Sequence, residues 1–348
     1  MNEIMDYKFK KHVSFSLSAI EEFNKESAFK VSLENFPIDK CMSYVRKEKD
    51  YFLIKIFFDD FISFKLNEYD KFGLKEKIFF KRSYRDYIVN KESFDSISLT
   101  FSDPKILTIK QRHFQEEDNT FYDNKMLRLI IKIEEESYFG DFECSSLHIE
   151  GVTYGWGLME VNICGKNYHF YGYKNDDKKE KYLFIDSVKE DNFEEFKRNT
   201  NAIILANGFI TGNLFQSEYY YQVINHKDNY TEVKATSYFK QESSVLTNIK
   251  LFNRFDFRDY LKYYDKEFLF DTFPNYIEAK TFSNICEFII SNPAYKRSIK
   301  LLVEGNNTDL LLLRAGVFSI ALETITGFIS DENEKVLKPI SDKKLSKK

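Results

Sequence analysis

Short runs in which apolar and polar residues alternate recur along residues 11–240, and this period of two is typical of half-buried β-strands. Clusters of Asn, Asp and Lys separate the runs, and Gly165-Lys-Asn marks a hairpin. Many strands with few helices between them predict an antiparallel sandwich or a strongly curved sheet. The predicted strands are residues 12–18, 29–33, 51–58, 61–66, 97–101, 106–110, 127–133, 161–164, 168–173, 219–224 and 232–239.

Beyond residue 245 the apolar positions recur every three or four residues, as in helices. One earlier helix interrupts the strands, from a cap at Asp191 to a stop at Asn207-Gly208. Later helices are predicted near residues 249–260, at 281–290, and from 308 or 309 to 329. The predicted fold class is therefore α+β. An antiparallel β-rich domain with one inserted helix occupies residues 1–243, and an α-helical region occupies residues 244–348.

The last predicted helix is apolar enough for a protein core and contains one Arg and one Glu. At 100° per residue, one face carries Leu310, Arg314, Val317, Phe318 and Ala321, and a second line carries Gly316, Ser319, Glu323 and Gly327. Small residues would let another helix approach closely. Either the two charges pair with neighbouring helices or reach water, or this helix forms a helix–helix interface or a buried polar site. The candidate interface residues are Arg314, Gly316, Phe318 and Glu323.

The segment Phe318-Ser-Ile-Ala-Leu-Glu-Thr-Ile, which follows a β-rich region, resembles bacterial abortive-infection proteins of the ApeA type. That resemblance implies a β-rich domain joined to a helical HEPN domain, a role in defence against phage, and RNA as the effector target. Residues 244–348 would then begin a longer HEPN-like domain. HEPN ribonucleases use an Arg-x(4–6)-His motif, and no Arg of this sequence has a His at that spacing. We therefore assign no catalytic residue, and ribonuclease activity would need a longer chain to supply the motif.

Charge and cysteine usage narrow the class of protein. The net charge of −4 provides no overall attraction to nucleic acid or to anionic membranes. The first residues lack the apolar segment of a signal peptide, and the four cysteines are far apart in the sequence. These features predict a cytoplasmic protein with reduced thiols and no membrane partner. No cofactor is expected.

Two Cys–His pairs suggest a zinc site as one alternative. Cys144 and His148 are four residues apart, and Cys164 and His169 are five residues apart, on either side of the predicted hairpin turn. Zinc accepts all four ligands, but the spacings are poor for a single tetrahedral site. Buried thiols and imidazoles on the face of a sheet are the competing interpretation.

Basic residues alternate with aromatic residues in the segment 75–85. Such a segment can follow a phosphate backbone while its rings stack on bases. The same residues would also protect an exposed edge strand from pairing with another chain. The candidate nucleic-acid or ligand residues are Lys77, Lys81, Arg82, Tyr84 and Arg85, together with the single tryptophan, Trp156.

The sequence contains no Gly-x-Ser-x-Gly, phosphate-loop or His-Glu-x-x-His motif. The first hypothesis is a non-catalytic sensor or binding protein. Its β-rich domain would recognise RNA or a phage protein, and its C-terminal helices would form a homo-oligomer or carry an effector. The alternatives are an enzyme without a known motif, with its pocket between sheet and helices, or a structural zinc protein.

Overall fold

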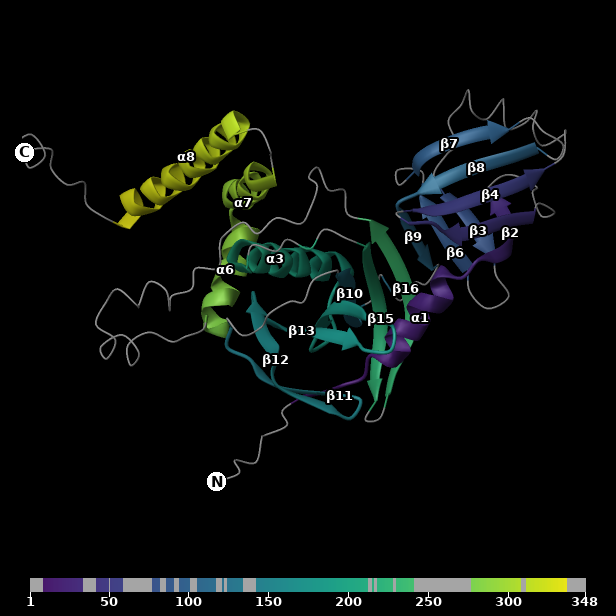
Figure 1. Ribbon diagram of the computed structural model, residues 1–348, viewed down its shortest axis with the longest axis horizontal. Helices are drawn as coiled ribbons and strands as arrows, with labels where there is room; N and C mark the ends of the chain where they lie inside the picture. The colour runs from purple at the N-terminus through teal and green to yellow at the C-terminus, as the bar shows by residue number, and fades with distance from the viewer. Residues whose placement is uncertain are drawn as a thin grey trace, which may run out of the picture. The chain divides into compact units, whose positions relative to one another are not determined.

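The structure is a computed structural model, and it confirms an α+β fold with a β-rich N-terminal part and helices toward the C-terminus (Figure 1). It describes residues 9–33, 42–49, 51–58, 77–81, 86–90, 94–100, 105–116, 121, 124–133, 142–211, 215, 218–227, 230–240, 277–307 and 311–336. The chain divides into two compact units. The first comprises residues 1–161, 166–196 and 217–242, and the second comprises residues 162–165, 197–216 and 243–348. The division therefore does not follow a single cut at 243/244.

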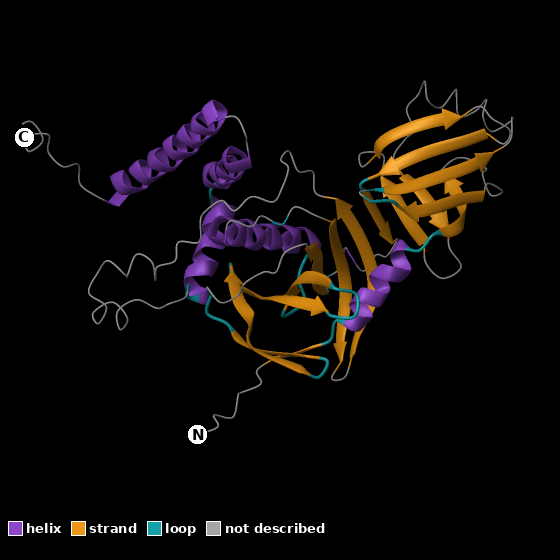
Figure 2. Cartoon of the chain, viewed as in Figure 1, coloured by secondary structure: helices purple, strands orange, loops and turns teal. Residues whose placement is uncertain are grey.

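The strands form one continuous sheet. The first strands are β1 (Phe9–Lys11), β2 (Ser27–Leu33), β3 (Met42–Lys47), β4 (Phe52–Phe58), β5 (Lys77–Lys81), β6 (Asp86–Asn90), β7 (Phe94–Thr100) and β8 (Lys105–Gln111). The others are β9 (His113–Glu116), β10 (Met126–Ile133), β11 (Ser145–Ile149), β12 (Val152–Ile163), β13 (Lys166–Asn175), β14 (Glu180–Ser187), β15 (Glu218–Lys227) and β16 (Tyr230–Lys240). Figure 2 shows these strands in orange.

The order of the strands shows that the sheet curves. It runs β1-β11-β12-β13-β14-β10-β15-β16-β9-β6-β5-β2-β3-β4-β8-β7 among the described residues. Neighbours are antiparallel except for β1, which lies parallel to β11. Only Arg112 separates β8 from β9 in the chain, yet five strands lie between them in the sheet order. The sheet must therefore turn back on itself, so the curved sheet is the correct alternative.

Aromatic side chains fill much of the core inside this curve. Tyr87 and Phe114 stack with ring centroids 5.0 Å apart, and Phe52 stacks on Phe114 at 4.7 Å. Phe23 and Tyr238 meet the ring of Phe52 edge-on at 5.4 and 5.1 Å. All five are buried. Large rings on inward-facing strand positions thus fill a wide core, as their propensity for sheets suggests.

The predicted strand at residues 12–18 is wrong, because these residues lead into helix α1 (Ser14–Asn24). Val13, Leu17, Ile20 and Phe23 are the buried apolar positions, and they recur every three or four residues. The alternation of residues 12–18 covered too short a window to show this period. The β-rich part therefore contains α1 in addition to the predicted helix.

That predicted helix is α3 (Phe193–Thr211), and both of its expected ends need correction. The cap is Asn192, whose Oδ1 accepts hydrogen bonds from the N–H groups of Glu194 at 3.1 Å and Glu195 at 3.2 Å. Asp191 instead accepts a hydrogen bond from Tyr168 and pairs with Lys166. The helix continues beyond Asn207-Gly208, since one glycine weakens a helix without having to end it.

The predicted hairpin is present, with its turn at the two residues between β12 and β13. Cys164 has φ 51° and Gly165 has φ 80°, both in the left-handed region that a two-residue type I′ turn requires. Glycine adopts this conformation without a steric penalty. The turn belongs to the second unit, where the N–H of Cys164 donates to Glu287 Oε1 at 2.6 Å.

The remaining helices of the second unit are α6 (Ala279–Ser291), α7 (Pro293–Asn307) and α8 (Leu311–Val336). Pro293 is the first residue of α7, a position where its missing N–H costs nothing. The α7 helix packs against both α6 and α8. Among the described residues no helix is long and apolar enough to cross a membrane. The strand predicted at 61–66 and the helix predicted near 249–260 lie outside the described residues.

Candidate functional site

The predicted basic patch cannot be assembled from the described side chains. Lys77 and Lys81 are the first and last residues of β5. The structure describes the backbone pairing of this strand but not its side chains. Arg82, Tyr84 and Arg85 lie outside the described residues. Trp156 lies in β12, and its side chain is likewise not described. This patch stays a prediction.

The candidate zinc ligands occupy four separate surroundings. Cys144 is half-buried, and burial raises the pKa of its thiol to about 12. His148 Nδ1 lies 3.0 Å from Thr153 Oγ1. Cys164 is exposed in the hairpin turn, and His169 is buried against the ring of Phe9 at 4.3 Å. The described part of the chain contains no group of three or more side chains placed to hold a metal ion.

Helix α8 is far more exposed than its sequence predicts. Leu312 is 90% exposed, and Leu313, Ile320 and Leu322 are 53%, 50% and 57% exposed. Ala321, on the opposite side, is fully buried. The expectation of a buried core helix is therefore wrong for this side of α8, because α7 is the helix that packs extensively against it and covers one side only.

The four candidate interface residues divide between the two sides of α8. Arg314 and Phe318 are half-buried, on the same side as Ala321. Gly316 and Glu323 are exposed, on the other side. A Cβ atom added to Gly316 would meet nothing within 4 Å. We call Leu312, Leu313, Gly316, Ile320, Glu323 and Gly327 the exposed α8 face, since they fall within about 100° of arc on a helix.

A buried ionic cluster in the first unit is the most elaborate polar arrangement that the sequence did not predict. Arg128 lies opposite Asp186 on neighbouring strands β10 and β14, and both side chains are fully buried. Arg128 Nε and Nη2 donate to the two oxygens of Asp186 at 2.7 and 2.8 Å. This geometry is the bidentate pairing that a guanidinium group favours.

The other N–H groups of Arg128 connect the sheet to the N-terminal segment. Nη1 donates to His12 O at 2.9 Å and to Ser16 Oγ at 2.8 Å, and Nη2 also donates to Tyr171 Oη at 3.0 Å. All five donors of the guanidinium are therefore used. Asp186 and Tyr171 outweigh the effect of burial and raise the pKa of Arg128, so it stays charged.

Lys11 adds a second cation to the cluster. Its Nζ lies 3.1 Å from Asp186 Oδ2, and its side chain is only 8% exposed. Burial lowers the pKa of Lys11, and the charge of Arg128 lowers it further, against the opposing effect of Asp186. Two cations and one carboxylate thus meet in a low-dielectric environment, where excess charge is costly.

A carboxylate from a distant turn holds the start of α1. Glu150 Oε1 accepts hydrogen bonds from the N–H groups of Val13 at 3.1 Å and Ser14 at 2.8 Å. An anion at a helix N-terminus satisfies N–H groups that have no partner within the helix and interacts well with the helix dipole. Burial raises the pKa of Glu150, but these hydrogen bonds outweigh it and leave the pKa below its usual value.

These contacts make the ionic cluster an anchor for the N-terminal segment. The five N–H groups of Arg128 are satisfied, and Gln222 Nε2 adds a further hydrogen bond, to Ser16 O, at 3.0 Å. In the sequence, the cluster is indicated only by a single charged residue within each of two apolar strands, Leu127-Arg-Leu-Ile-Ile and Leu183-Phe-Ile-Asp. The pairing could not be read from that signal, because it depends on the register between β10 and β14.

Comparison with protein-family models, curated proteins and solved structures finds no match to this chain.

Proposed function

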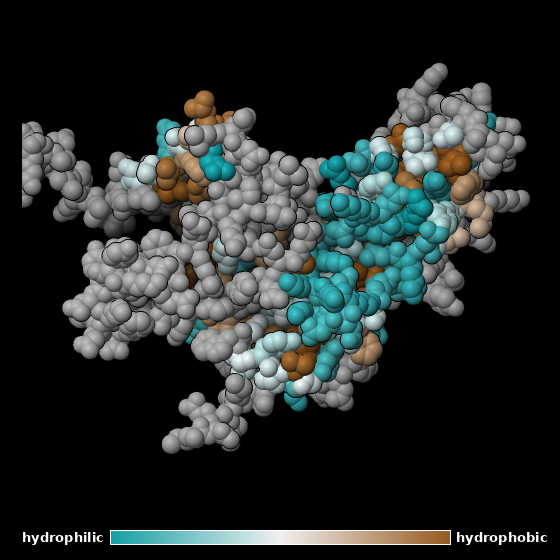
Figure 3. All heavy atoms as spheres, in the orientation of Figure 1, coloured by the Kyte–Doolittle hydropathy of each residue, from teal (hydrophilic) through white to brown (hydrophobic). Residues whose placement is uncertain are grey.

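We propose that this chain is a self-associating binding protein, in which the β-rich unit binds a partner and the exposed α8 face pairs with a second copy. The observation that supports self-association is the exposure of Leu312, Leu313 and Ile320 on one side of α8. Figure 3 shows hydrophobic residues, in brown, at the surface in the region of this helix. A helix that is apolar all round is normally buried, and exposed apolar patches mark interaction sites.

The exposed α8 face suits a two-fold pair of antiparallel helices. About Ile320 as the centre, Leu313 and Gly327 are equally distant in sequence, so each Leu313 would face Gly327 of the second copy. A large residue facing a small one lets helix backbones approach closely. Two-fold interfaces require this kind of self-complementarity.

Two substitutions test this pairing by light scattering coupled to size exclusion. Ile320→Asp places a charge in the interface and is expected to reduce the mass to that of one chain. Ala315→Asp is the control, because Ala315 is exposed on α8 outside this face. It should leave the mass unchanged.

Gly316→Leu separates pairing from folding. The space over Gly316 is open in the single chain. Glycine is less favourable in a helix than alanine by about 0.8–1.0 kcal/mol, and leucine ranks just below alanine. We expect the melting temperature to hold or rise while the mass falls. A wild-type mass of one chain at micromolar concentration, or equal masses for all variants, would refute self-association.

The resemblance of residues 318–325 to ApeA-type proteins supports a defence setting in the bacterial cytoplasm. The chain would be expected to reduce plaque formation when its gene is expressed in a host challenged with phage, and Ile320→Asp would remove that protection. Equal plaque numbers with and without the gene over a broad phage panel would contradict this setting.

A further inference from the structure

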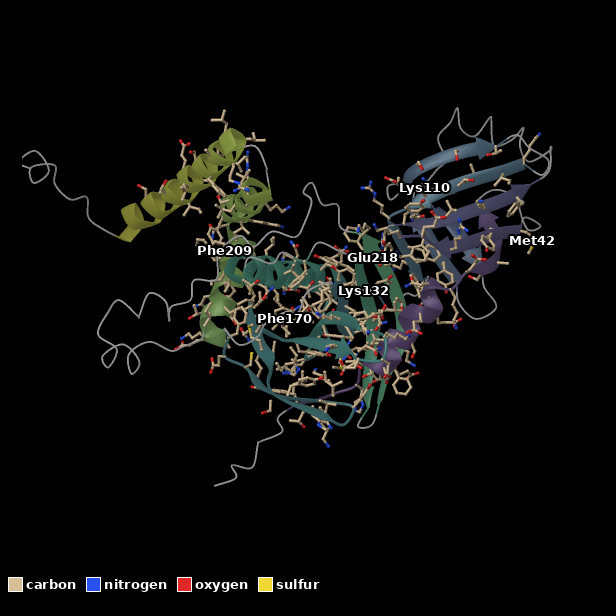
Figure 4. The ribbon with its side chains drawn as sticks, viewed as in Figure 1. Met42, Lys110, Lys132, Phe170, Phe209 and Glu218 are labelled. Carbon is tan, nitrogen blue, oxygen red and sulfur yellow. The ribbon has the colours of Figure 1, made fainter. Side chains whose placement is uncertain are left out.

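The outward face of four strands carries a set of side chains that the proposed function does not yet use. Three rows of directly opposed residues cross β3, β4, β8 and β7. They are Arg46, Leu53, Lys110 and Ser96; then Tyr44, Lys55, Thr108 and Ser98; then Met42, Phe57, Ile106 and Thr100. We call these twelve residues the β3–β7 outer face. Figure 4 labels Lys110 and Met42, which lie toward opposite ends of it.

This face is open to solvent. The residues between those of the rows, such as Val45, Ile54 and Ile109, point the other way and belong to the buried core. All twelve outer residues except Leu53 are at least partly exposed. The side chains on this face are therefore available to a ligand.

The charge on the β3–β7 outer face is of one sign. It contains three basic residues and no acidic residue, although the chain as a whole carries −4. Glu48 borders the face and pairs with Arg46 at 2.5 Å. Among the described residues, neither Lys55 nor Lys110 forms a salt bridge. Lys110 Nζ lies over the ring of Tyr51 at 4.9 Å, and its charge helps to lower the pKa of Glu48. Lys55 and Lys110 are diagonal neighbours on adjacent strands, about 7–8 Å apart, and are available to an anionic ligand.

The other residues suit bases and sugars. Tyr44 and Phe57 place rings next to Lys55 on the same face, and rings beside cations are the components of a surface for single-stranded nucleic acid. Four hydroxyl groups line its β7 side, from Ser96, Ser98, Thr100 and Thr108. The 2′-hydroxyl of RNA can both donate to and accept from such groups.

We infer that the β3–β7 outer face binds single-stranded RNA, with Lys55 and Lys110 at the phosphates and Tyr44 and Phe57 stacked on bases. This inference specifies the partner of the β-rich unit and so rests on the proposed function. It differs in position from the segment 75–85, whose side chains are not described.

Fluorescence anisotropy with a labelled 15-nucleotide oligouridine tests the inference on the full chain. Losing two phosphate contacts should lower the slope of log affinity against log salt by about 1.4, at roughly 0.7 per contact. Lys55→Glu/Lys110→Glu should therefore weaken binding at least tenfold at low salt. Lys189→Glu/Lys280→Glu makes the same charge change at exposed positions elsewhere and should retain most of the affinity.

Tyr44→Ala provides a test without a charge change and should weaken binding roughly 5- to 150-fold, the contribution of one stacked base. Equal weakening by both double variants, or no binding by the wild type at 50 mM salt, would overturn the inference. Oligothymidine DNA that binds as tightly as RNA would overturn the assignment to RNA.

Light scattering on the same samples distinguishes this inference from self-association. The Lys55→Glu/Lys110→Glu protein should keep the wild-type mass, and Ile320→Asp should keep RNA affinity per chain. A loss of RNA binding with an unchanged mass would therefore test RNA binding by the β3–β7 outer face without testing self-association through α8.

Discussion

The excess positive charge of the buried ionic cluster leads to a prediction that distinguishes its members. Among the described residues, Asp186 is the carboxylate that pairs with both buried cations, Arg128 and Lys11. Asp186→Asn keeps the shape of the side chain but leaves both cations without a counter-charge. Removing one partner of a buried pair costs about 3–5 kcal/mol in the free energy of unfolding. That loss is a large fraction of the roughly 5–15 kcal/mol that stabilises a typical domain.

Lys11→Met should behave differently. It removes the cation whose pKa is lowered by burial and leaves Arg128 and Asp186 as a balanced pair with two hydrogen bonds. Methionine retains much of the apolar stem, so we expect a change within about 1 kcal/mol, of either sign. The double variant Asp186→Asn/Lys11→Met should be more stable than Asp186→Asn alone, because one uncompensated cation remains instead of two.

Urea unfolding followed by far-UV circular dichroism measures these differences, and hydrogen exchange in β10 and β14 assigns them to the first unit. Asp176→Asn is the control, since the side chain of Asp176 is 83% exposed and its pair with Lys174 contributes little. If Lys11→Met destabilised the protein as much as Asp186→Asn, the view of Lys11 as a surplus cation would be wrong.

Three further predictions concern pH and backbone conformation. Burial raises the pKa of Tyr171, Tyr219 and Tyr220. Their contribution to stability is therefore complete below pH 10 and is lost as the pH rises above it, by up to about 1.4 kcal/mol per pH unit for each. Alkaline unfolding followed by circular dichroism should begin there, and Tyr220→Phe should make the fall of stability with pH less steep. Glu150→Gln should lower the free energy of unfolding by about 0.5–2 kcal/mol at neutral pH. The variant should also lack the loss of stability that the wild type shows through Glu150 as the pH falls below 4.5. An unchanged urea midpoint would exclude a capping role. Gly165→Ala should cost about 1 kcal/mol in thermal melts because of its positive φ, whereas equal stability would show that the turn tolerates a side chain.

The sequence allowed most strands to be predicted because alternation reports directly on a half-buried sheet. It failed at residues 12–18, where the alternating run was short and the helical period became visible only with Ile20 and Phe23. It also misplaced the start of α3, since Asp191 and Asn192 are both good caps and only the contacts of Asp191 with Lys166 and Tyr168 decide between them.

The candidate sites were harder to predict than the strands. The period of α8 identified the side that carries Arg314, Phe318 and Ala321, but burial depends on which helices pack against it. The pairing of Arg128 with Asp186 and the β3–β7 outer face both depend on strand register, which joins residues far apart in the chain. A motif search has no means of detecting such sets.

The anchoring of α1 has a consequence for how the protein is made. Its partners come much later in the sequence: Glu150 follows Ser14 by 136 residues, and Thr231, which donates to His12 O, follows it by 219. At 5–20 residues per second, roughly 10–40 s pass on the ribosome between completion of α1 and arrival of Thr231. During that time α1, which carries Leu17, Ile20 and Phe23, lacks its packing against β16, so the nascent N-terminus is a natural substrate for chaperones.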